Sequence, residues 1–412
     1  MAITIQDQPI TIKPRPAYSP IDYLVTSTNT AESGFKLIVS VHKSPSGTNE
    51  KVSTLQLNTI PNATQLVADI QNIVKSFVTS SYSILSGDTT DVDSNELSEF
   101  KLAFQEYYNG ALQGSSASGN VFQSWNASPK YTEFSSGNYE EWSLDQYEVN
   151  QFLNGFRTNK TDFFNFSSSD NWLKVRPTQK IQANWIIRNG FLGNQEVWLK
   201  TLDSNFTALQ TYTLSASNDD AQYSLDIGFS ELSSHSWDVT FSDTNVKYYV
   251  FGIYDDNDLN FMTEFLLFEV DECEDTYTDY ELHWLNRKGG YDSFVFSGKS
   301  NQTTNIDKTF AKYNTRRISG SSVVHNTYAQ RKRAFHTSTR ESYELNSRLL
   351  KDFEVEGLED LMSSPEVYWR SDDGFFAVNV EGNTYKHSKS ENGEVFNLAL
   401  TMEIDNSDNR QW

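Results

Sequence analysis

The sequence predicts a mainly β protein made of several β-sandwiches, with a few short helices and a C-terminal β-rich (α+β) domain. Three observations support this fold class. Apolar residues alternate with polar ones over short stretches that Gly, Pro, Asn and Ser bound. Aromatic residues, which favour strands and are rare in disordered chains, make up 14% of the sequence. The length of 412 residues exceeds that of one typical domain, so more than one hydrophobic core is expected.

Five stretches show the alternation of a strand that buries one face. In chain order they are residues 35–41, the stretch with Phe100, Leu102 and Phe104, the stretch with Trp237, Val239 and Phe241, the pair Leu282 and Trp284, and the stretch with Leu398, Leu400, Met402 and Ile404. Alternate residues of a strand share one face, so each stretch predicts one apolar and one polar face. This pattern favours antiparallel sheets, and the frequency of short strands favours sandwiches.

Two helices are expected. The first has apolar residues at the spacing i, i+4, i+7, i+8 and i+11, which forms one helical stripe: Leu66, Ile70, Ile73, Val74 and Phe77. Asn62 or Thr64 would cap its N-terminus, and the helix would cover one end of the first sandwich. A shorter helix is predicted over residues 357–362, and the Ser-Ser-Pro sequence that follows would end it.

Polar and acidic stretches suggest where domains end. Residues 114–119 (Gly-Ser-Ser-Ala-Ser-Gly) predict a mobile loop, and the polar residues 165–171 could join two domains. The acidic run 271–279 precedes a change in the sign of the charge. We therefore expect an N-terminal β-sandwich with one covering helix in residues 1–165, a second β-sandwich in 166–275, and a β-rich assembly domain in 276–412 that contains a basic segment, 308–351.

Charge is distributed unevenly along the chain. The formal net charge of −22 argues against a protein whose whole surface meets nucleic acid or anionic lipid. The basic segment 308–351 has ten basic and two acidic residues, a net +8, which leaves −30 for the remainder. The candidate partner contacts in it are Arg316, Arg317, Arg331, Lys332, Arg333 and Arg340. They could grip an acidic surface of a neighbouring copy or partner, face nucleic acid that passes nearby, or pair with the acidic body of their own chain.

No motif for catalysis or for a cofactor is present in the sequence. The six histidines show no H-x-H, H-E-x-x-H or i, i+4 pair, and the single cysteine, Cys273, supports neither an intrachain disulfide nor a thiolate zinc cage. G-x-S-x-G and P-loop patterns are absent, and no pair of carboxylates stands out for glycoside hydrolysis. The oxygen-rich stretches 91–95 and 255–258 are more typical of solvated turns than of calcium loops. We expect no catalytic residue, no cofactor and no metal site.

Export and membrane insertion are not expected from the sequence. The N-terminal residues lack a basic region followed by an apolar stretch, so no Sec-type signal is recognised. The apolar runs are also much shorter than the roughly 20 residues that span a bilayer.

Three stretches together carry a pattern found in a known group of proteins. Residues 280–296 combine a strand, an Asn-Arg-x-Gly-Gly turn and an aromatic strand. Ser19-Pro20-Ile21 precedes residues 25–29 and the strand 35–41, and residues 357–368 combine a short helix, a Ser-Pro turn and a strand. In these places the chain resembles uncharacterised structural proteins of tailed phages, including crAss-like phages and other phages of Bacteroidetes and marine bacteria.

The resemblance implies a role in the virion and lends no catalytic residue. We expect a structural component of the tail region, as a tail hub, ring or baseplate/adaptor protein that acts through subunit assembly and not as an enzyme. Its partners would be other copies of itself and neighbouring virion proteins, with no membrane, and with nucleic acid only in transient contact near the basic segment. The alternative is a carbohydrate- or receptor-binding β-sandwich protein of the tail, which the many Trp and Tyr residues favour and which would bind a host surface glycan.

Overall fold

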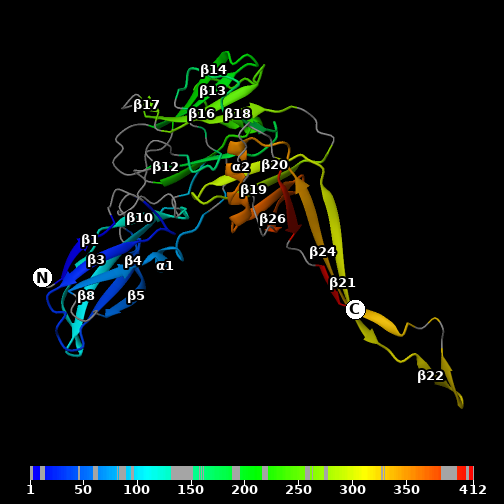
Figure 1. Ribbon diagram of the computed structural model, residues 1–412, viewed down its shortest axis with the longest axis horizontal. Helices are drawn as coiled ribbons and strands as arrows, with labels where there is room; N and C mark the ends of the chain where they lie inside the picture. The colour runs from blue at the N-terminus through cyan, green and yellow to red at the C-terminus, as the bar shows by residue number, and fades with distance from the viewer. Residues whose placement is uncertain are drawn as a thin grey trace. The chain divides into compact units, whose positions relative to one another are not determined.

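A computed structural model describes the protein over residues 3–9, 14–44, 47–58, 64–80, 82, 90–93, 97–130, 152–156, 158, 160, 162–187, 195–215, 221–255, 260–261, 263–272, 277–325, 328, 330–381, 397–404 and 408–411 (Figure 1). The described chain is mainly β and is arranged in several separate sheets. Its helices are short, with α1 at Gln71–Val74, α2 at Asp352–Leu358 and 3-10 helices at Phe229–Ser234 and Asp360–Ser363. The predicted fold class, multi-domain and of the β-sandwich type, is confirmed.

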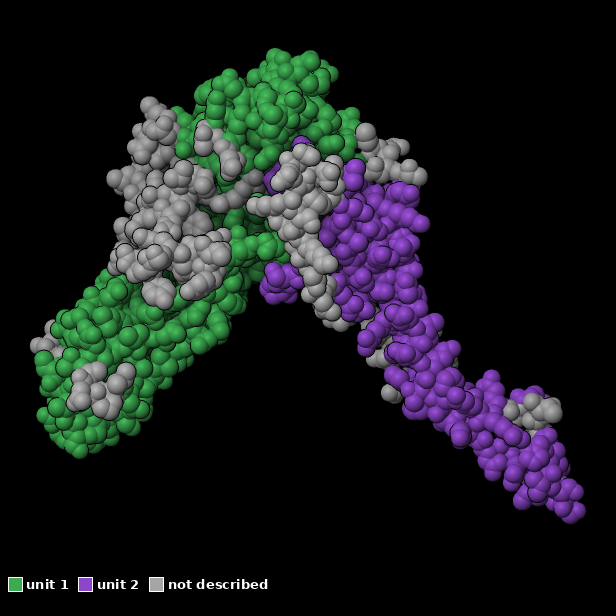
Figure 2. Space-filling model, in the orientation of Figure 1, with its two compact units in different colours: residues 1–272, 285–293, 356–360 green, residues 273–284, 294–355, 361–412 purple. Residues whose placement is uncertain are grey.

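The chain divides into two compact units (Figure 2). Unit 1 comprises residues 1–272, 285–293 and 356–360, and unit 2 comprises residues 273–284, 294–355 and 361–412. In the described residues unit 1 contains four separate sheets. Whether unit 1 divides further at residue 165, as the sequence suggests, stays a prediction.

The first part of unit 1 has two sheets that share one hydrophobic cluster. The smaller sheet has the order β1-β3-β6, with strands Ile3–Asp7, Asp22–Ser27 and Gln65–Asp69. The larger has the order β2-β10-β8-β4-β5, with strands Arg15–Pro16, Phe122–Trp125, Ser98–Tyr108, Lys36–Lys43 and Glu50–Asn58, and β9 (Ala111–Ser118) pairs with β8. Alternate residues of β3, β4 and β8 are buried between the sheets, so the strands predicted around Phe35 and Phe100 are confirmed.

The first predicted helix is wrong in its N-terminal half. Leu66 belongs to β6, where Leu66 and Ala68 are buried while their neighbours are exposed. This alternation has the period of a strand, and pairing with β3 selects it over the helical period that the same apolar positions also fit. Only Gln71–Val74 is helical, and the Asp69 carboxylate accepts a hydrogen bond from the Gln71 N–H at 2.9 Å. Of the two expected caps, Thr64 precedes β6, and Asn62 lies outside the described residues.

The loop predicted at residues 114–119 is also wrong, because this stretch forms most of strand β9. Tyr108 and Ala111 are paired across β8 and β9, so Asn109 and Gly110 form a two-residue turn, and both have positive φ (52° and 81°). An Asn-Gly pair suits such a hairpin turn. The turn therefore fixes a strand whose own Ser-rich residues have little strand preference.

The second part of unit 1 has two further sheets. One has the order β11-β18-β16-β13-β14, with strands Leu173–Val175, Leu266–Val270, Tyr248–Asp255, Gln195–Leu202 and Ala208–Ser215, and β17 (Asn260–Phe261) pairs with β16. The other has the order β12-β15-β7, with strands Gln182–Ile187, Ala221–Asp226 and Thr90–Asp93.

The strand predicted around Trp237 is wrong. Trp237 is buried and its indole N–H donates to the Leu232 carbonyl at 2.6 Å, whereas Val239 is exposed, so the three apolar residues share no face. Asp238 instead bonds Thr213 through its N–H and its carboxylate, at 3.0 and 2.8 Å. One local bond within and after the 3-10 helix Phe229–Ser234, and these two bonds to β14, take the place of a strand ladder.

Most of unit 2 is built around one sheet with the order β20-β19-β25-β26-β27-β24-β21. Its strands are Tyr291–Phe296, Tyr280–Leu285, Val367–Ser371, Gly374–Glu381, Ala399–Ile404, Lys332–Asn346 and Asn301–Lys312, and β28 (Asp408–Gln411) pairs with β24. Leu282, Trp284, Leu400 and Met402 are buried, which confirms the strands predicted there. A separate hairpin consists of β22 (Arg316–Ser319) and β23 (Ser322–His325).

The last predicted helix exists, but its predicted start is wrong. Helix α2 begins at Asp352, five residues before Gly357, and the 3-10 helix Asp360–Ser363 follows it. The Glu354 carboxylate accepts a hydrogen bond from the Lys351 N–H at 2.9 Å, which caps the earlier start. No helix in the described part of the chain is long and apolar enough to cross a membrane.

Candidate functional site: a basic, exposed β-arm

The most distinctive surface of unit 2 is a long β-ribbon, residues 301–346, which we call the arm. It comprises β21, β22, β23 and β24, and β21 pairs with β24 from Asn301 opposite Glu344 to Lys312 opposite Lys332. In Figure 1 β21 and β24 run side by side, and β22 lies at the far end of the ribbon. Twelve residues of β21 at about 3.3 Å each give a ribbon of roughly 40 Å.

Very little of the arm is buried. Every residue of β21 from Asn301 to Phe310 is exposed, so neither face of this strand packs on a core. The β-branched residues of β21 and β24 favour strands, and the backbone ladder with its cross-strand pairs holds the ribbon. At the far end Ser319 is paired with Ser322, and Gly320 takes the positive φ (61°) that this tight turn needs. The arm is thus an ordered element that presents nearly all of its side chains to solvent.

All six residues predicted as partner contacts lie on the arm and are exposed. Arg316 and Arg317 begin the far hairpin, Arg331, Lys332 and Arg333 lie where the chain returns, and Arg340 lies opposite Asn305. None of the six forms an ion pair with a residue that the structure describes. Their role as contacts stays a prediction.

The arm also brings like charges together. Residues 308–340 contain eight Lys and Arg and no Asp or Glu. Lys312 lies directly opposite Lys332, an arrangement that destabilises a sheet, and the Lys332 ammonium lies 4.2 Å from the centre of the Phe310 ring. The concentrated positive charge would be relieved by an acidic surface.

Apolar residues on the arm were missed by the sequence reasoning, which considered only its charge. The large exposed hydrophobic residues of the arm are Ile306, Phe310, Tyr313, Ile318, Val323, Tyr328 and Phe335. Ile318 and Val323 face each other across the far hairpin and are 82% and 62% exposed. The sequence did carry a signal, because apolar residues flank Gly320 at positions that a two-residue turn would pair. Exposed apolar residues grouped in this way mark interaction surfaces.

The base of the arm is fixed firmly within unit 2. Tyr343 is buried, and its hydroxyl accepts a hydrogen bond from Gln302 at 3.0 Å and donates one to Glu341 at 3.3 Å. Burial raises the pKa of the Tyr343 hydroxyl, and the charge of Glu341 raises it further. Arg348 forms an ion pair of 2.5 Å with the buried Glu354. The base of the arm is therefore buried and hydrogen-bonded, unlike the rest of the arm.

The Asn-Arg-Lys-Gly-Gly turn, residues 286–290, belongs to the interior of unit 1. The Asn286 side-chain oxygen accepts hydrogen bonds from the N–H groups of Lys288 and Gly290, at 2.9 and 3.1 Å. Its amide donates to the Leu153 carbonyl and to Asp292, both at 2.7 Å. Gly289 has φ +90°, and its carbonyl accepts a hydrogen bond from Gln222 at 2.9 Å. This motif therefore has a packing role that accounts for Asn286 and for the two glycines.

Asp292 is the buried carboxylate beside this turn. It accepts hydrogen bonds from the Gly155 N–H at 2.9 Å and from the side chains of Asn154 and Asn286. Burial raises the pKa of Asp292 to about 6, and the hydrogen bonds and the nearby Lys288 oppose this shift. These hydrogen bonds fix the orientation of the Asp292 carboxylate. Among the contacts described, no hydroxyl or thiol that could act as a nucleophile lies beside it.

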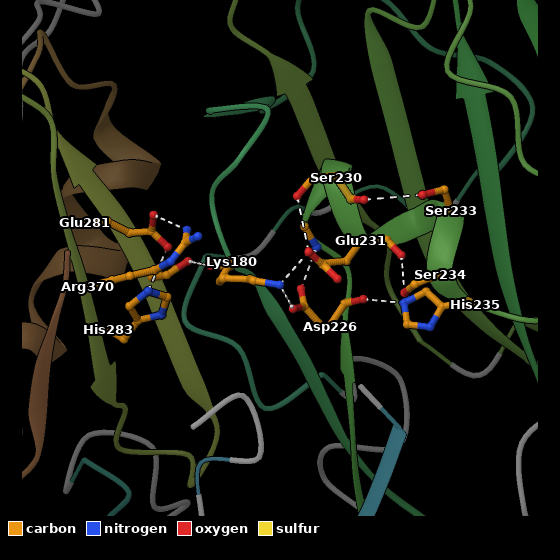
Figure 3. A network of polar contacts seen from close by, with 12 residues as sticks. Lys180, Asp226, Ser230, Glu231, Ser233, Ser234, His235, Glu281, His283 and Arg370 are labelled. Carbon is orange, nitrogen blue, oxygen red and sulfur yellow. Dashed lines mark hydrogen bonds and ion pairs between the residues drawn. The ribbon is translucent and has the colours of Figure 1, made fainter. Parts of the chain in front are cut away.

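Two further polar clusters are present, one in unit 1 and one in unit 2 (Figure 3). In unit 1, Lys180 lies 3.2 Å from Asp226 and 2.6 Å from Glu231, and burial raises the pKa of Asp226. A ring nitrogen of His235 lies 2.6 Å from the Asp226 carbonyl, and the neighbouring Ser234 hydroxyl donates to the Glu231 carbonyl. A catalytic serine would form a hydrogen bond with the histidine that acts as its base. Among the hydrogen bonds described in this cluster, no serine hydroxyl contacts the His235 ring.

The cluster of unit 2 is a cross-strand ion pair. Glu281 lies opposite Arg370 across β19 and β25, at 2.8 Å between the charged groups, and it also contacts His283 at 2.8 Å. No group of three or more His, Cys, Asp or Glu that could hold a metal ion occurs among the described residues. Most of the stretches 91–95 and 255–258 lies outside them or has undescribed side chains.

The fold and the arm thus define a class of protein: a multi-sheet β protein that carries a basic, partly apolar β-arm. Neither a protein-family model nor a curated protein matches this chain.

Proposed function

We propose that this protein is a structural component of a tailed-phage virion that acts through subunit assembly, as a tail hub, ring or baseplate/adaptor protein. The observation that carries the proposal is the arm, an ordered ribbon that buries almost none of its own surface and carries both basic and apolar side chains. Because the arm buries so little surface, it contributes little to the stability of its own chain. It is suited to cover, or be covered by, another subunit.

Two further observations support assembly in a particle. The resemblance of residues 280–296 and of the two other stretches is to virion structural proteins. The chain also combines a net +8 in residues 308–351 with −30 elsewhere, so each copy offers charges of both signs to its neighbours.

Mass spectrometry and electron microscopy of purified phage particles test this proposal. We expect the protein in a fixed ratio to the tail proteins, and labelled antibody at the tail region. Absence of the protein from purified particles would refute the proposal.

A shortened arm tests the mechanism. Lys312 and Lys332 lie opposite each other, so an Asn-Gly turn in place of residues 313–331 closes the ribbon without disturbing the paired strands. The shortened protein should unfold at the same temperature as the wild type and fail to enter particles. Incorporation at the wild-type level would show that the outer arm has no part in assembly.

Glycan or receptor binding is the second candidate function. Tyr313 and Tyr328 are exposed on the arm, where aromatic rings could stack on a sugar. The test is binding of the isolated protein to host cells and glycan arrays, compared with a Tyr313→Ala/Tyr328→Ala variant. Binding that the variant loses would favour this function, and no binding at high concentration would count against it.

A further inference from the structure

The far hairpin of the arm, residues 316–325, is a two-stranded sheet with an exposed apolar pair on one face. Ile318 and Val323 are directly opposite each other, and Arg316 and His325 form the next pair on the same face. A two-stranded hairpin is marginally stable in water unless another surface packs on it. Its exposed apolar pair, bordered by positive charge, therefore calls for a covering surface with an apolar centre and acidic borders.

A surface of that description lies on the outer face of the β1-β3-β6 sheet. The inner face of this sheet, with Tyr23 and Leu66, is buried in the core. On the outer face Leu24 lies directly opposite Val67, which is 57% exposed. The sheet thus presents an apolar pair in which Val67 is exposed and Leu24 is half-buried.

Carboxylates border this apolar pair. Asp22 lies directly opposite Asp69, and Asp7 lies opposite Leu24. Burial raises the pKa of Asp22, the charges of Asp69 and Asp7 raise it further, and Arg15 opposes them. Like charges directly opposite each other destabilise a sheet, so these carboxylates would gain from a basic neighbour.

We infer that the hairpin 316–325 of one copy docks on the outer face of the β1-β3-β6 sheet of a second copy. The apolar pair Ile318/Val323 meets the pair Leu24/Val67, and Arg316, which lies on the same face of the hairpin, meets the carboxylates of the sheet. The occupant is a second copy because every chain carries both surfaces, with opposite charge and the same apolar centre. This inference rests on the proposed role in subunit assembly.

The contact is heterologous, since different surfaces of the two copies meet. Such contacts close into rings or continue as helical filaments, according to the rotation between neighbours. A ring position in a tail is consistent with this geometry, and a rotation of 180° gives the smallest closed form, a dimer with two reciprocal contacts.

A charge-swap experiment tests the contact. Variant A is Arg316→Glu/Arg317→Glu, which reverses Arg316 on the docking face of the hairpin and Arg317 beside it in the strand. Variant B is Asp7→Lys/Asp69→Lys on the sheet. The assay is analytical ultracentrifugation of the full chain, with A and B carrying different fluorescent labels. We expect the wild type to self-associate and A and B alone to stay monomeric. Their mixture should form complexes that contain both labels, because the unchanged hairpin of B meets the unchanged sheet of A and the two reversed surfaces complement each other.

Two controls separate docking from folding. Lys51→Glu/Lys299→Glu makes the same charge change as variant A at exposed positions away from both surfaces, and it should associate like the wild type. Asp69 also bonds the Gln71 N–H, so variant B could lose stability. The exposed apolar residues give a second test. Val67→Ser and Ile318→Ser should each lower the association constant about tenfold. The double variant should lower it less than about a hundredfold, because the two side chains contact each other.

Each other outcome contradicts the inference in a recognisable way. If A alone and B alone each associate like the wild type, docking occurs elsewhere. The proposed function is then still decided separately, by whether the protein is present in purified particles. If only a chain that carries all four substitutions recovers wild-type behaviour, the surfaces pair within one chain. If the wild type binds duplex DNA and variant A alone loses this binding, the hairpin recognises nucleic acid instead. A wild type that stays monomeric refutes the docking.

Discussion

Gly289 shows how strongly a single residue can constrain this fold. Its φ of +90° is strained for any L side chain, and an added Cβ would lie 2.5 Å from the Asn126 carbonyl oxygen. The positive φ follows from the turn itself, and the clash follows from the packing of the turn inside unit 1. A sequence pattern can indicate a glycine turn, but only the surrounding packing shows that no larger residue fits.

We predict that Gly289→Ala destabilises the protein by about 2–4 kcal/mol, from backbone strain together with the steric clash. Urea denaturation followed by tryptophan fluorescence measures the change. Gly34→Ala is the matched control, because Gly34 has φ +70° but open space around its Cβ position, so it should cost only about 1 kcal/mol. Equal losses in both variants would show that the clash is relieved without cost.

Asp292 predicts a dependence of stability on pH. Its pKa is raised from 3.8 to about 6 in the folded protein, so between these values the folded state holds a proton that the unfolded state has lost. Stability should therefore fall as pH rises through this window, by up to about 1.4 kcal/mol per pH unit, and level off above it. Burial raises the pKa of Asp226 and of Asp360 as well, and both act in the same direction.

Asp292→Asn tests this assignment. The amide would direct N–H groups at the donors of Gly155, Asn154 or Asn286, so the variant should be less stable throughout. It should also lose part of the fall in melting temperature between about pH 4 and pH 6. A variant with the full wild-type slope would place the titrating group elsewhere.

At the scale of elements, the alternation of apolar and polar residues correctly predicted strands that pair with other alternating strands. The residues 35–41 and the stretch at Phe100 alternate and pack in one core, as predicted. Leu66 and Ile70 fit a helical stripe and a strand equally well, and β3 decided between them. The Ser-rich β9 depends on a turn and a partner strand, so composition alone could not reveal it.

The opposed lysines of the arm give a prediction at this scale. Lys312→Glu would place opposite charges across β21 and β24, so the arm should become more stable by about 0.2–1 kcal/mol. Hydrogen exchange of the amides of residues 310–312 and 332–334 measures the change. Lys308→Glu is the control, because Lys308 faces Thr337 and gains no opposite charge. Faster exchange in Lys312→Glu would contradict the expected attraction.

At the scale of the whole molecule, the charge pattern of the sequence predicted the basic part of the candidate site. The structure added its apolar residues and its exposure. The positions of the six basic residues on one segment follow from sequence. Their display on an exposed ribbon, beside seven exposed apolar residues, does not. Strand patterns describe which faces could be buried, and they do not say that β21 lacks a core on either face.

Self-association should depend on salt if the two charged surfaces meet. Screening shortens the range of exposed charges from about 10 Å at 0.1 M salt to about 3 Å at 1 M. We therefore predict that the association constant of the wild type falls as sodium chloride is raised, while the Arg316→Glu/Arg317→Glu variant shows little dependence. Sedimentation at a series of salt concentrations measures both. Association that strengthens with salt would assign the contact to apolar residues alone.

The sequence by itself determined that the protein is mainly β and multi-sheet, that its charge is divided, and that its basic residues lie in one segment, because period, composition and charge are local properties. Only the tertiary structure decided that residues 301–346 form an exposed arm, that β6 is a strand, and that the Gly-Gly turn is buried. Each of these depends on which distant strands pair and what they leave uncovered, and no local pattern contains that information.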